Sequence, residues 1–251
     1  MSPEVLKVSA LSAHALWAST YDLNASPILR LEERIVEDLL FSAGDDTWGR
    51  APDGWAPRQV SILDAGCGTG RWLAKLVQPD VAGIGIDLSA PMLRQAQRRP
   101  GLSERLVQAD CSNIPLRSAA IDLAISSFCV AYMPVVRPFA QELARVVRPG
   151  GHLILSDFHP SARVRGWTRS FRHEETIVEI LSFEHPLDRI CDVFEQEGFE
   201  LERLAEPQFS ECDRQAFQQA GREDLFRKVF GEIAIFVCAF RRKAHETVRD
   251  L

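Results

Sequence analysis

The chain has 251 residues, of which 46% are hydrophobic, and a formal net charge of −6. This length and composition can bury a substantial core, and we expect one α/β domain with additions. The negative charge disfavours broad attraction to nucleic acid or to an anionic membrane and favours a small-molecule substrate. No apolar run approaches the roughly 20 residues that span a bilayer, and the first residues, MSPEVLK, lack the pattern of a signal peptide.

The six cysteines are dispersed along the chain, with no Cys-x-x-Cys pair and no zinc-ligand spacing to the histidines. We therefore expect reduced thiols, no metal site and a cytoplasmic location. The expected assembly is a monomer or a homodimer.

Residues 13–42 place apolar side chains at helical spacing and are predicted to form helix, followed by a loop rich in glycine and proline over 43–59. From residue 60, short β-rich runs alternate with helical ones, and this βαβ rhythm predicts a parallel sheet with right-handed crossovers. The predicted strands are 60–63, 81–86, 105–108, 121–126 and 152–156, and the predicted helices are 70–77, 90–98 and 135–147. Residues 149–151, Pro-Gly-Gly, are predicted to form a tight break before the last strand.

The stretch 159–185 interrupts the rhythm with polar and aromatic residues. Beyond it we predict a helix over 186–196, a strand over 199–204, a terminal strand over 233–240 and a frayed tail at 241–251. Substrate contacts are expected from the N-terminal helix and from the segments 159–185 and 205–230, because variable segments outside the sheet units commonly carry specificity. Their aromatic residues, which pack or line a pocket, are Trp167, Phe171, Phe209, Phe217 and Phe226.

The segment Ile62-Leu63-Asp64-Ala65-Gly66-Cys67-Gly68-Thr69-Gly70-Arg71 joins an apolar strand to an expected helix through an acidic residue and three glycines at alternate positions. Glycine adopts positive φ angles and lets the backbone approach a ligand closely, as a nucleotide-cofactor loop requires. The third glycine comes one residue earlier than in the dinucleotide fingerprint Gly-x-Gly-x-x-Gly. The loop resembles motif I, Asp/Glu-x-Gly-x-Gly-x-Gly, of the class I S-adenosylmethionine (SAM) dependent methyltransferases.

This resemblance implies an α/β fold with a doubly wound, mostly parallel sheet of seven strands in the order 3-2-1-4-5-7-6, the last strand antiparallel, with helices on both faces and an N-terminal helical cap. The strand at 233–240 is then the seventh. A single domain over 1–251 is expected to contain four parts. These are the cap and loop at 1–59, the SAM-binding core at 60–158, the substrate-cap insertions and sixth strand at 159–230, and the terminal strand and tail at 231–251.

Two acidic residues follow the loop at the ends of the next two predicted strands. Asp87 lies about twenty residues beyond the loop, where a carboxylate can accept both ribose hydroxyls. Its other possible role is to cap the next helix, for which Ser89 is the better candidate. Asp110 either forms a turn or, as the resemblance implies, accepts from the adenine amino group, with the backbone of Cys111 at a ring nitrogen.

Further cofactor contacts follow from the same resemblance. Asp64 would orient the amino group of SAM, since a buried carboxylate needs such a partner, with Gly66, Cys67 and Gly68 beside the cofactor. Leu88 and Met92 are either apolar walls of the adenine site or ordinary core residues.

The region after the strand at 121–126 resembles the loop beneath the transferable methyl group, and its candidates for that floor are Ser127, Phe128 and Tyr132. Aromatic rings suit a sulfonium because their negative faces attract cations, although core packing is the simpler role of Phe128. Tyr21 resembles the N-terminal tyrosine that closes over the methionine carboxylate, and packing against the core is its alternative. Arg71 either stays solvated or pairs with that carboxylate.

Methyl transfer from a sulfonium is an in-line displacement without a metal, so the protein mainly aligns the acceptor with the methyl group. His159 is the candidate general base, because it follows the strand at 152–156 at the edge where open α/β sheets place their active sites. Its alternative is to fix the turn before Pro160. Tyr132 is the second candidate catalytic group. His173 and His185 are weaker candidates, and His14, His152 and His245 are expected to be structural or solvated.

The sequence therefore predicts a SAM-dependent methyltransferase that acts on an O, N or C nucleophile of a small metabolite and releases S-adenosylhomocysteine (SAH). Within that class, the acceptor is alternatively a carboxylate or a quinone precursor. A different class is a SAM- or SAH-binding regulator or cyclase without methyl transfer, and an NAD-dependent oxidoreductase comes third. We expect a small-molecule partner, no nucleic acid, no membrane and no metal.

Overall fold

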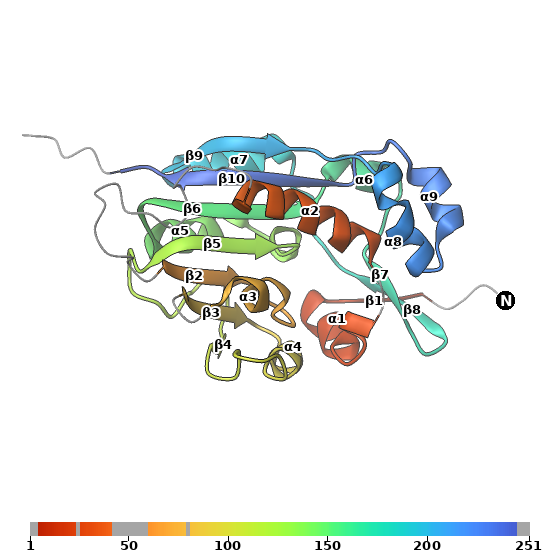
Figure 1. Ribbon diagram of the computed structural model, residues 1–251, viewed down its shortest axis with the longest axis horizontal. Coiled ribbons are helices and arrows are strands. Elements are labelled where there is room, and N and C mark those ends of the chain that lie inside the picture. Colours follow the sequence, from red (N-terminus) through yellow and green to blue (C-terminus); the bar gives the residue numbers. More distant parts are fainter. Residues whose placement is uncertain (1–4, 24–25, 42–59, 79–80, 245–251) are drawn as a thin grey trace, which may run out of the picture.

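The computed structural model describes residues 5–23, 26–41, 60–78 and 81–244. Its centre is a seven-stranded sheet in the order β4-β3-β2-β5-β6-β10-β9. Neighbouring strands are parallel, except that β10 runs antiparallel to both β6 and β9. Numbered along the chain within this sheet alone, the strands follow the order 3-2-1-4-5-7-6, and the predicted fold class is confirmed (Figure 1).

The predicted strands and helices of the main sheet are present, with ends that differ by a few residues. The strands are β2 (Val60–Ala65), β3 (Val81–Asp87), β4 (Leu106–Gln108), β5 (Ile121–Ser127), β6 (Val147–Phe158), β9 (Phe199–Ala205) and β10 (Ile235–Arg242). The helices beside them are α2 (Pro27–Phe41), α3 (Arg71–Leu76), α4 (Ala90–Ala96), α5 (Val136–Val146) and α7 (Leu187–Gln196).

Helices cover both faces of the sheet. On one face α2 and α3 bury Leu31 and Trp72 against the apolar side chains of β5 and β10. On the other face α5 and α7 bury Phe139 and Phe194 in a second core cluster (Figure 1). Helix α5 buries residues at helical spacing along one side, the pattern from which it was predicted. They are Val136, Phe139, Ala140 and Leu143.

The predicted break at 149–151 lies inside β6 and not before it. The pairing of β6 with β5 jumps from Val147 opposite Ile121 to His152 opposite Leu123, so the extra residues form a bulge. Gly150 has a φ of 75° within it. Glycine adopts that angle without strain, which is why the Pro-Gly-Gly run kinks the strand and does not end it.

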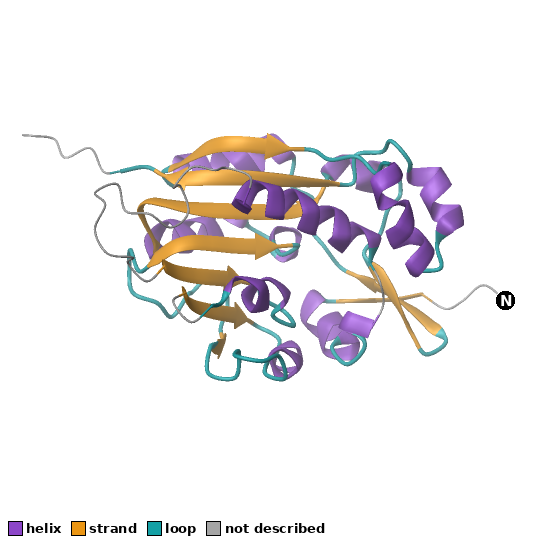
Figure 2. Cartoon of the chain, viewed as in Figure 1, coloured by secondary structure: helices purple, strands orange, loops and turns teal. Residues whose placement is uncertain are grey.

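A second, three-stranded sheet lies at the carboxyl ends of the main strands, in the order β1-β8-β7. Its strands are β1 (Val5–Val8), β7 (Ser170–His173) and β8 (Thr176–Ile180), and β1 pairs with β8 in parallel (Figure 2). Helix α1 (Ala10–Trp17) joins this sheet through Trp17, whose ring stacks on Phe171 at 4.4 Å between ring centroids. The N-terminal cap is therefore partly a sheet, where we predicted helix alone.

The predicted helix over 13–42 is also interrupted. After α1 the chain makes a short 3-10 helix, η1 (Tyr21–Leu23), before α2 begins. The polar residues between Trp17 and Tyr21 explain the break, because serine and threonine compete for backbone hydrogen bonds inside helices. The predicted loop at 43–59 and the tail from 245 lie outside the described residues.

The remaining short helices surround the same end of the sheet. They are η3 (Val130–Tyr132), α6 (Pro160–Val164), η4 (Glu211–Asp213), α8 (Arg214–Gln219) and α9 (Glu223–Val229). The buried carboxylate of Asp213 accepts a bond of 3.2 Å from Arg34, which fixes η4 and α8 against α2. Among the helices described, none is long and apolar enough to cross a membrane.

Candidate active site at the carboxyl edge of the sheet

A cavity of about 1520 Å³ lies between the carboxyl ends of the main strands and the cap. We call it the main cavity. Its lining comes from the glycine loop, the ends of β3 and β5, α1, the start of α2, the β7 strand and the α8–α9 pair. Open α/β sheets bind their ligands at this edge.

Most of the sequence-predicted site residues line the main cavity together. They are Tyr21, Gly66, Gly68, Asp87, Leu88, Met92, Asp110, Cys111, Ser127 and Tyr132. Four do not line it, namely Asp64, Cys67, Arg71 and His159.

The glycine loop turns sharply between β2 and α3. The amides of Gly66 and Cys67 both donate to the Ile86 carbonyl at 2.9 Å, and Gly66, Gly68 and Gly70 have φ angles of 77°, 53° and 75°. A Cβ atom on Gly66 would come within 2.6 Å of the Cys129 sulfur, whereas one on Gly68 would meet nothing within 4 Å. The backbone at Gly68 is thus open toward the cavity, as close approach of a cofactor requires.

Asp87 is held at the end of β3 by two backbone amides. Its Oδ2 accepts from the Gly68 amide at 2.8 Å and its Oδ1 accepts from the Ser89 amide at 2.7 Å. Burial raises the pKa of Asp87, opposed by these two bonds. Ser89 occupies the N-cap position of α4, but its side chain makes no capping bond and its buried hydroxyl has no hydrogen-bond partner. The preceding carboxylate therefore orders this turn, where we expected Ser89.

Asp110 has the turn-forming geometry that was its alternative role. Its Oδ1 accepts from the Ser112 amide at 2.8 Å and from the Ser112 hydroxyl at 2.7 Å. Near it Cys111 and Met92 are buried, while Leu88 is half-exposed in the cavity wall.

Asp64 and Cys67 lie behind the loop. The buried carboxylate of Asp64 accepts from the Leu73 amide at 3.1 Å and so satisfies a free donor in the first turn of α3. Burial raises the pKa of Asp64 to about 7. The sulfur of Cys67 packs on Gly85, where a Cβ atom would approach it within 2.9 Å. The side chains of both residues contact the interior of the protein and hold the loop in its conformation.

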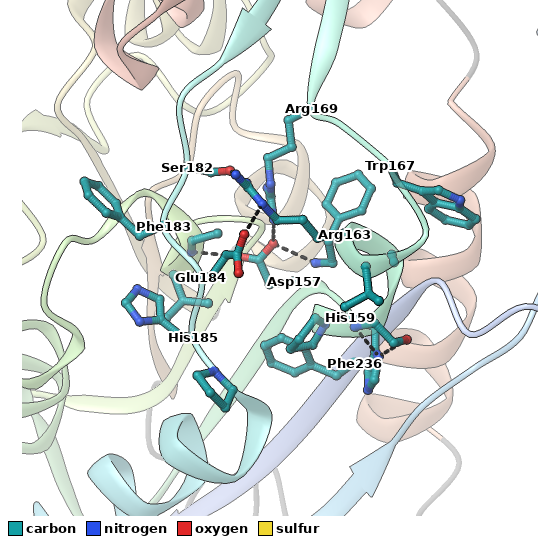
Figure 3. A pocket seen from close by; sticks show the side chains of 18 of the residues that line it. Asp157, His159, Arg163, Trp167, Arg169, Ser182, Phe183, Glu184, His185 and Phe236 are labelled. Carbon is teal, nitrogen blue, oxygen red and sulfur yellow. Dashed lines mark hydrogen bonds and ion pairs between the residues drawn. The ribbon is translucent and has the colours of Figure 1, made fainter.

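His159 lies in a smaller pocket of about 260 Å³, seen in Figure 3, which shares Arg169 and Phe158 with the lining of the main cavity. Its Nδ1 lies 2.6 Å from the Ser161 hydroxyl and its Nε2 lies 2.8 Å from Glu206, and it caps α6. This placement agrees with the alternative role, in which His159 fixes the turn before Pro160. It does not agree with a general base beside the glycine loop. Neither weaker candidate lines the main cavity, and His185 contacts the Met133 carbonyl at 2.7 Å.

The sequence reasoning missed Glu32, a fully buried carboxylate on α2. Four side chains donate to it: Arg71 at 2.7 Å, Trp72 at 3.1 Å, Ser127 at 2.9 Å and Ser156 at 2.8 Å. Arg71 is therefore not solvated, and its Nη1 is buried without a hydrogen-bond partner. An acidic residue within the apolar stripe of α2 was the available signal for this network.

A second missed contact fixes η1 on the glycine loop. Asp22 accepts from the Thr69 hydroxyl at 2.9 Å and from Arg99 at 2.7 Å, and Arg99 also donates to the Thr69 carbonyl at 2.6 Å. These bonds keep Tyr21 in the cavity wall, with its ring 4.7 Å from that of Trp17. Burial raises the pKa of Tyr21 to about 12.

Arg169 is a buried cation in the wall of the main cavity, between it and the smaller pocket. Its guanidinium pairs with the buried carboxylate of Asp157 and lies 4.4 Å from the centroid of the Phe158 ring and 5.1 Å from that of Tyr132. In Figure 3 the Arg169 side chain points toward Asp157. Asp157 also accepts from the Ala131 and Phe158 amides, so its position is fixed.

His14 also lines this part of the cavity, although we expected it to be structural or solvated. Its ring lies edge-on to Tyr132, at 5.2 Å between centroids. Burial, together with the smaller effect of the nearby Arg169, lowers the pKa of His14 to about 4. Burial raises the pKa of Tyr132. The imidazole is therefore neutral and weakly basic, and the phenol stays protonated.

Phe128 stands at the turn after β5 with a φ of 53°, which is unusual for a residue with a large side chain. Its ring lines the cavity and lies 5.5 Å from that of Phe158. Such backbone strain of about 1–3 kcal/mol is typically retained at ligand sites. The predicted floor of Ser127, Phe128 and Tyr132 thus lies along one cavity wall.

Comparison with known proteins agrees with this geometry. Residues 63–155 match the family described as a methyltransferase domain. The chain is 31% identical over 189 residues to malonyl-[acyl-carrier protein] O-methyltransferase of Pseudescherichia vulneris, covering 71% of this chain and 69% of that protein. It is 34% identical over 119 residues to phthiotriol/phenolphthiotriol dimycocerosates methyltransferase of Mycobacterium leprae, covering 44% of this chain and 42% of that protein.

Solved structures show the same fold. One is an S-adenosylmethionine dependent methyltransferase from Mesorhizobium loti, with 20% identity, a TM-score of 0.56, and coverage of 74% of this chain and 94% of that one. Another is geranyl diphosphate C-methyltransferase from Streptomyces coelicolor, with 15% identity, a TM-score of 0.58, and coverage of 85% and 80%.

The chain therefore belongs to the class I SAM-dependent methyltransferases. SAM is its methyl donor, and SAH is the product of the donor. Within the class it falls with the enzymes that methylate small molecules.

Proposed function

We propose that this enzyme methylates a carboxylate of a small acidic acceptor. The observation that carries the proposal is Arg169, a buried guanidinium in the wall of the same cavity as Gly66, Gly68 and Asp87. A guanidinium presents several N–H donors in one plane and matches a carboxylate. Asp157 and the Tyr132 hydroxyl engage part of the five N–H donors of Arg169, and we infer that the others can meet a second carboxylate.

In this proposal the lining residues named above, apart from Tyr132, hold the cofactor end. Asp87 accepts the ribose hydroxyls, the Asp110–Cys111 turn meets the adenine edge, and Leu88 and Met92 cover its faces. The open backbone at Gly68, where a Cβ atom would meet nothing within 4 Å, supports the fit. Tyr21 closes this end, and Asp64 acts indirectly by holding α3. SAM supplies an electrophilic methyl group on a sulfonium.

The titratable groups of the cavity favour an acceptor that is already an anion. A hydroxyl, phenol or protonated amine must lose a proton during transfer, whereas a carboxylate is ionised at neutral pH. His14, with a pKa of about 4, is a weak base, and the phenol of Tyr21, with a pKa of about 12, is protonated. Asp157 is engaged by Arg169 and two amides. A carboxylate needs none of them as a base.

The printed name of the Pseudescherichia vulneris relative supports the same acceptor chemistry, since a malonyl group carries a carboxylate. The second candidate acceptor is a hydroxyl or phenol whose proton passes to His14. The position of His14 against Tyr132 in the cavity wall favours this alternative. A base with a pKa of about 4 is already deprotonated at neutral pH, so methyl transfer is flat around neutral pH for both candidates, and the identity of the acceptor has to separate them.

The test is methyl transfer from labelled SAM to a panel of short carboxylic acids and matched phenols. Arg169→Lys keeps the charge opposite Asp157 but loses the planar donors, and we expect KM for the acids to rise about tenfold to a hundredfold. The control is Arg163→Lys, because Arg163 lines only the smaller pocket. SAH binding and melting temperature must remain unchanged in both. Methylation of phenols alone, or equal KM values in both variants, would reject the carboxylate proposal.

We further propose that 1–251 is one domain with the four parts predicted from the sequence, and that it works as a monomer or a homodimer. The mixed cap supports a single domain, because β1 in the N-terminal part pairs with β8 in the insertion. Light scattering of the purified chain would give its assembly.

A further inference from the structure

The main cavity is larger than one ligand needs. It measures about 1520 Å³, whereas pockets that enclose a drug-sized ligand measure about 300–1,000 Å³. About 500 Å³ or more therefore remains when a cofactor of that size is bound. The acceptor is the ligand that would occupy this remaining volume.

One part of the cavity away from the glycine loop has many apolar lining residues. It is bounded by the start of α2, the segment after α6 and the α8–α9 pair, which lie together beyond the carboxyl ends of the strands (Figure 1). We call it the apolar arm. It is lined by Ile28, Trp167, Phe209, Phe217, Leu225 and Val229.

Aromatic rings form a continuous wall along the apolar arm. Trp167 and Phe209 stack with 6.3 Å between ring centroids, and Phe209 meets Phe217 edge-on at 4.9 Å. Phe209 and Phe217 are almost fully buried and still line the cavity, so their positions are fixed by the core behind them. Rigid rings of this kind offer a large apolar contact area with little loss of side-chain freedom.

The mouth of the arm also exposes apolar surface. Leu225 is 39% exposed and lines the cavity, and the polar side chains of Gln219 and Arg222 stand beside it. An apolar wall that ends in a polar rim is typical of a ligand groove. Trp167 is only two residues from Arg169 in the chain, and both line the cavity.

We propose that the acceptor is amphiphilic, with its acidic head at Arg169 and a hydrocarbon chain in the apolar arm. This inference rests on the proposed function for the position of the head. It adds the specificity of the enzyme, which is for an acid that carries an extended apolar chain and not for a short polar acid. The α8–α9 pair and Trp167 then determine which chain length is accepted.

The test measures binding of straight-chain monocarboxylic acids, from butanoic to dodecanoic acid, to the SAH complex by calorimetry. Each methylene that enters an apolar site improves affinity about fourfold, so the dissociation constant must fall steeply with chain length until the arm is full. A dissociation constant that does not depend on chain length would overturn the inference.

Two matched variants separate the arm from general hydrophobic binding. Leu225→Gln is expected to weaken binding of dodecanoic acid about tenfold and to leave binding of butanoic acid and SAH unchanged. Leu204→Gln changes the same residue type at a similar exposure, 43%, on β9 outside the cavity, and must have no effect. An equal loss of affinity in both variants, or an equal loss of affinity for both acids in Leu225→Gln, would contradict the proposed role of the apolar arm.

The same experiment distinguishes the two proposals. If affinity rises with chain length but Arg169→Lys binds the acids as the wild type does, the apolar arm stands and the carboxylate proposal fails. If Arg169→Lys weakens every acid equally and chain length has no influence, the carboxylate proposal stands and the arm fails.

Discussion

Gly66 and Gly68 offer a sharp test of how the loop works, because alanine at the two positions should have different consequences. Both residues have positive φ angles, so a Cβ atom strains the backbone by about 1–2 kcal/mol at either position. At Gly66 the new Cβ atom also lies 2.6 Å from the Cys129 sulfur, and such overpacking adds about 1–3 kcal/mol. We therefore expect Gly66→Ala to lower the free energy of unfolding by about 2–5 kcal/mol and Gly68→Ala by about 1–2 kcal/mol.

For cofactor binding the order of the two variants should be reversed, with the larger loss in Gly68→Ala. At Gly68 the Cβ atom enters open space on the cavity side. There it would prevent the close approach of the cofactor to the backbone of the loop, so we expect SAH affinity to fall at least about tenfold. Urea denaturation measures the stability and calorimetry with SAH measures the affinity. Cys129→Ala in the Gly66→Ala background should recover about 1–3 kcal/mol. Equal destabilisation by both glycine variants, or no recovery in the double variant, would refute the steric argument.

Three further predictions concern buried charges. Asp87→Ala should abolish measurable SAH binding in calorimetry, while a folded far-UV spectrum persists; binding within about threefold of wild type would contradict its role. Glu32→Gln should lower the free energy of unfolding by about 3–5 kcal/mol in urea, because Arg71 loses its buried counter-charge. Asp64 has a folded pKa of about 7, well above that of an unfolded aspartate, so the native state holds more protons and stability should fall as pH rises from about 4 to 7. In Asp64→Asn the total loss of stability between about pH 4 and pH 7 should be smaller by up to about 4 kcal/mol, as measured by denaturation at several pH values. An unchanged pH dependence would exclude Asp64 as its source.

The sheet and the glycine loop could be predicted because their information is local. Each strand and its helix lie within a short stretch, and Asp64, Gly66 and Gly68 follow one another in the turn that joins β2 to α3. Alternation of apolar runs with amphipathic helices is sufficient to give a parallel sheet. The error within this region, at Pro149-Gly150-Gly151, is one of context, because the same residues form a turn or a bulge depending on whether the partner strand continues.

The cap could not be predicted in the same way, because its contacts join distant parts of the chain. Strand β1 has four residues, mostly exposed, and pairs Val5 with Ile177. A strand of that length has no readable periodicity, and its formation depends on a partner that only the fold supplies. His14 illustrates the consequence, since a single histidine on a short helix gives no indication that Tyr132 lies against its ring.

This division between local and distant information also explains why the donor is easier to identify than the acceptor. The match to the methyltransferase family ends at residue 155, whereas Arg169 and the apolar arm lie outside it. A buried guanidinium needs a counter-charge before any acceptor binds, and Asp157, fixed by two amides at the end of β6, provides it. The scaffold thus keeps a cation in the cavity wall, which the proposed acceptor carboxylate would share with Asp157. The pairing of Asp157 with Arg169 is therefore the feature by which relatives with an acidic acceptor should be sought.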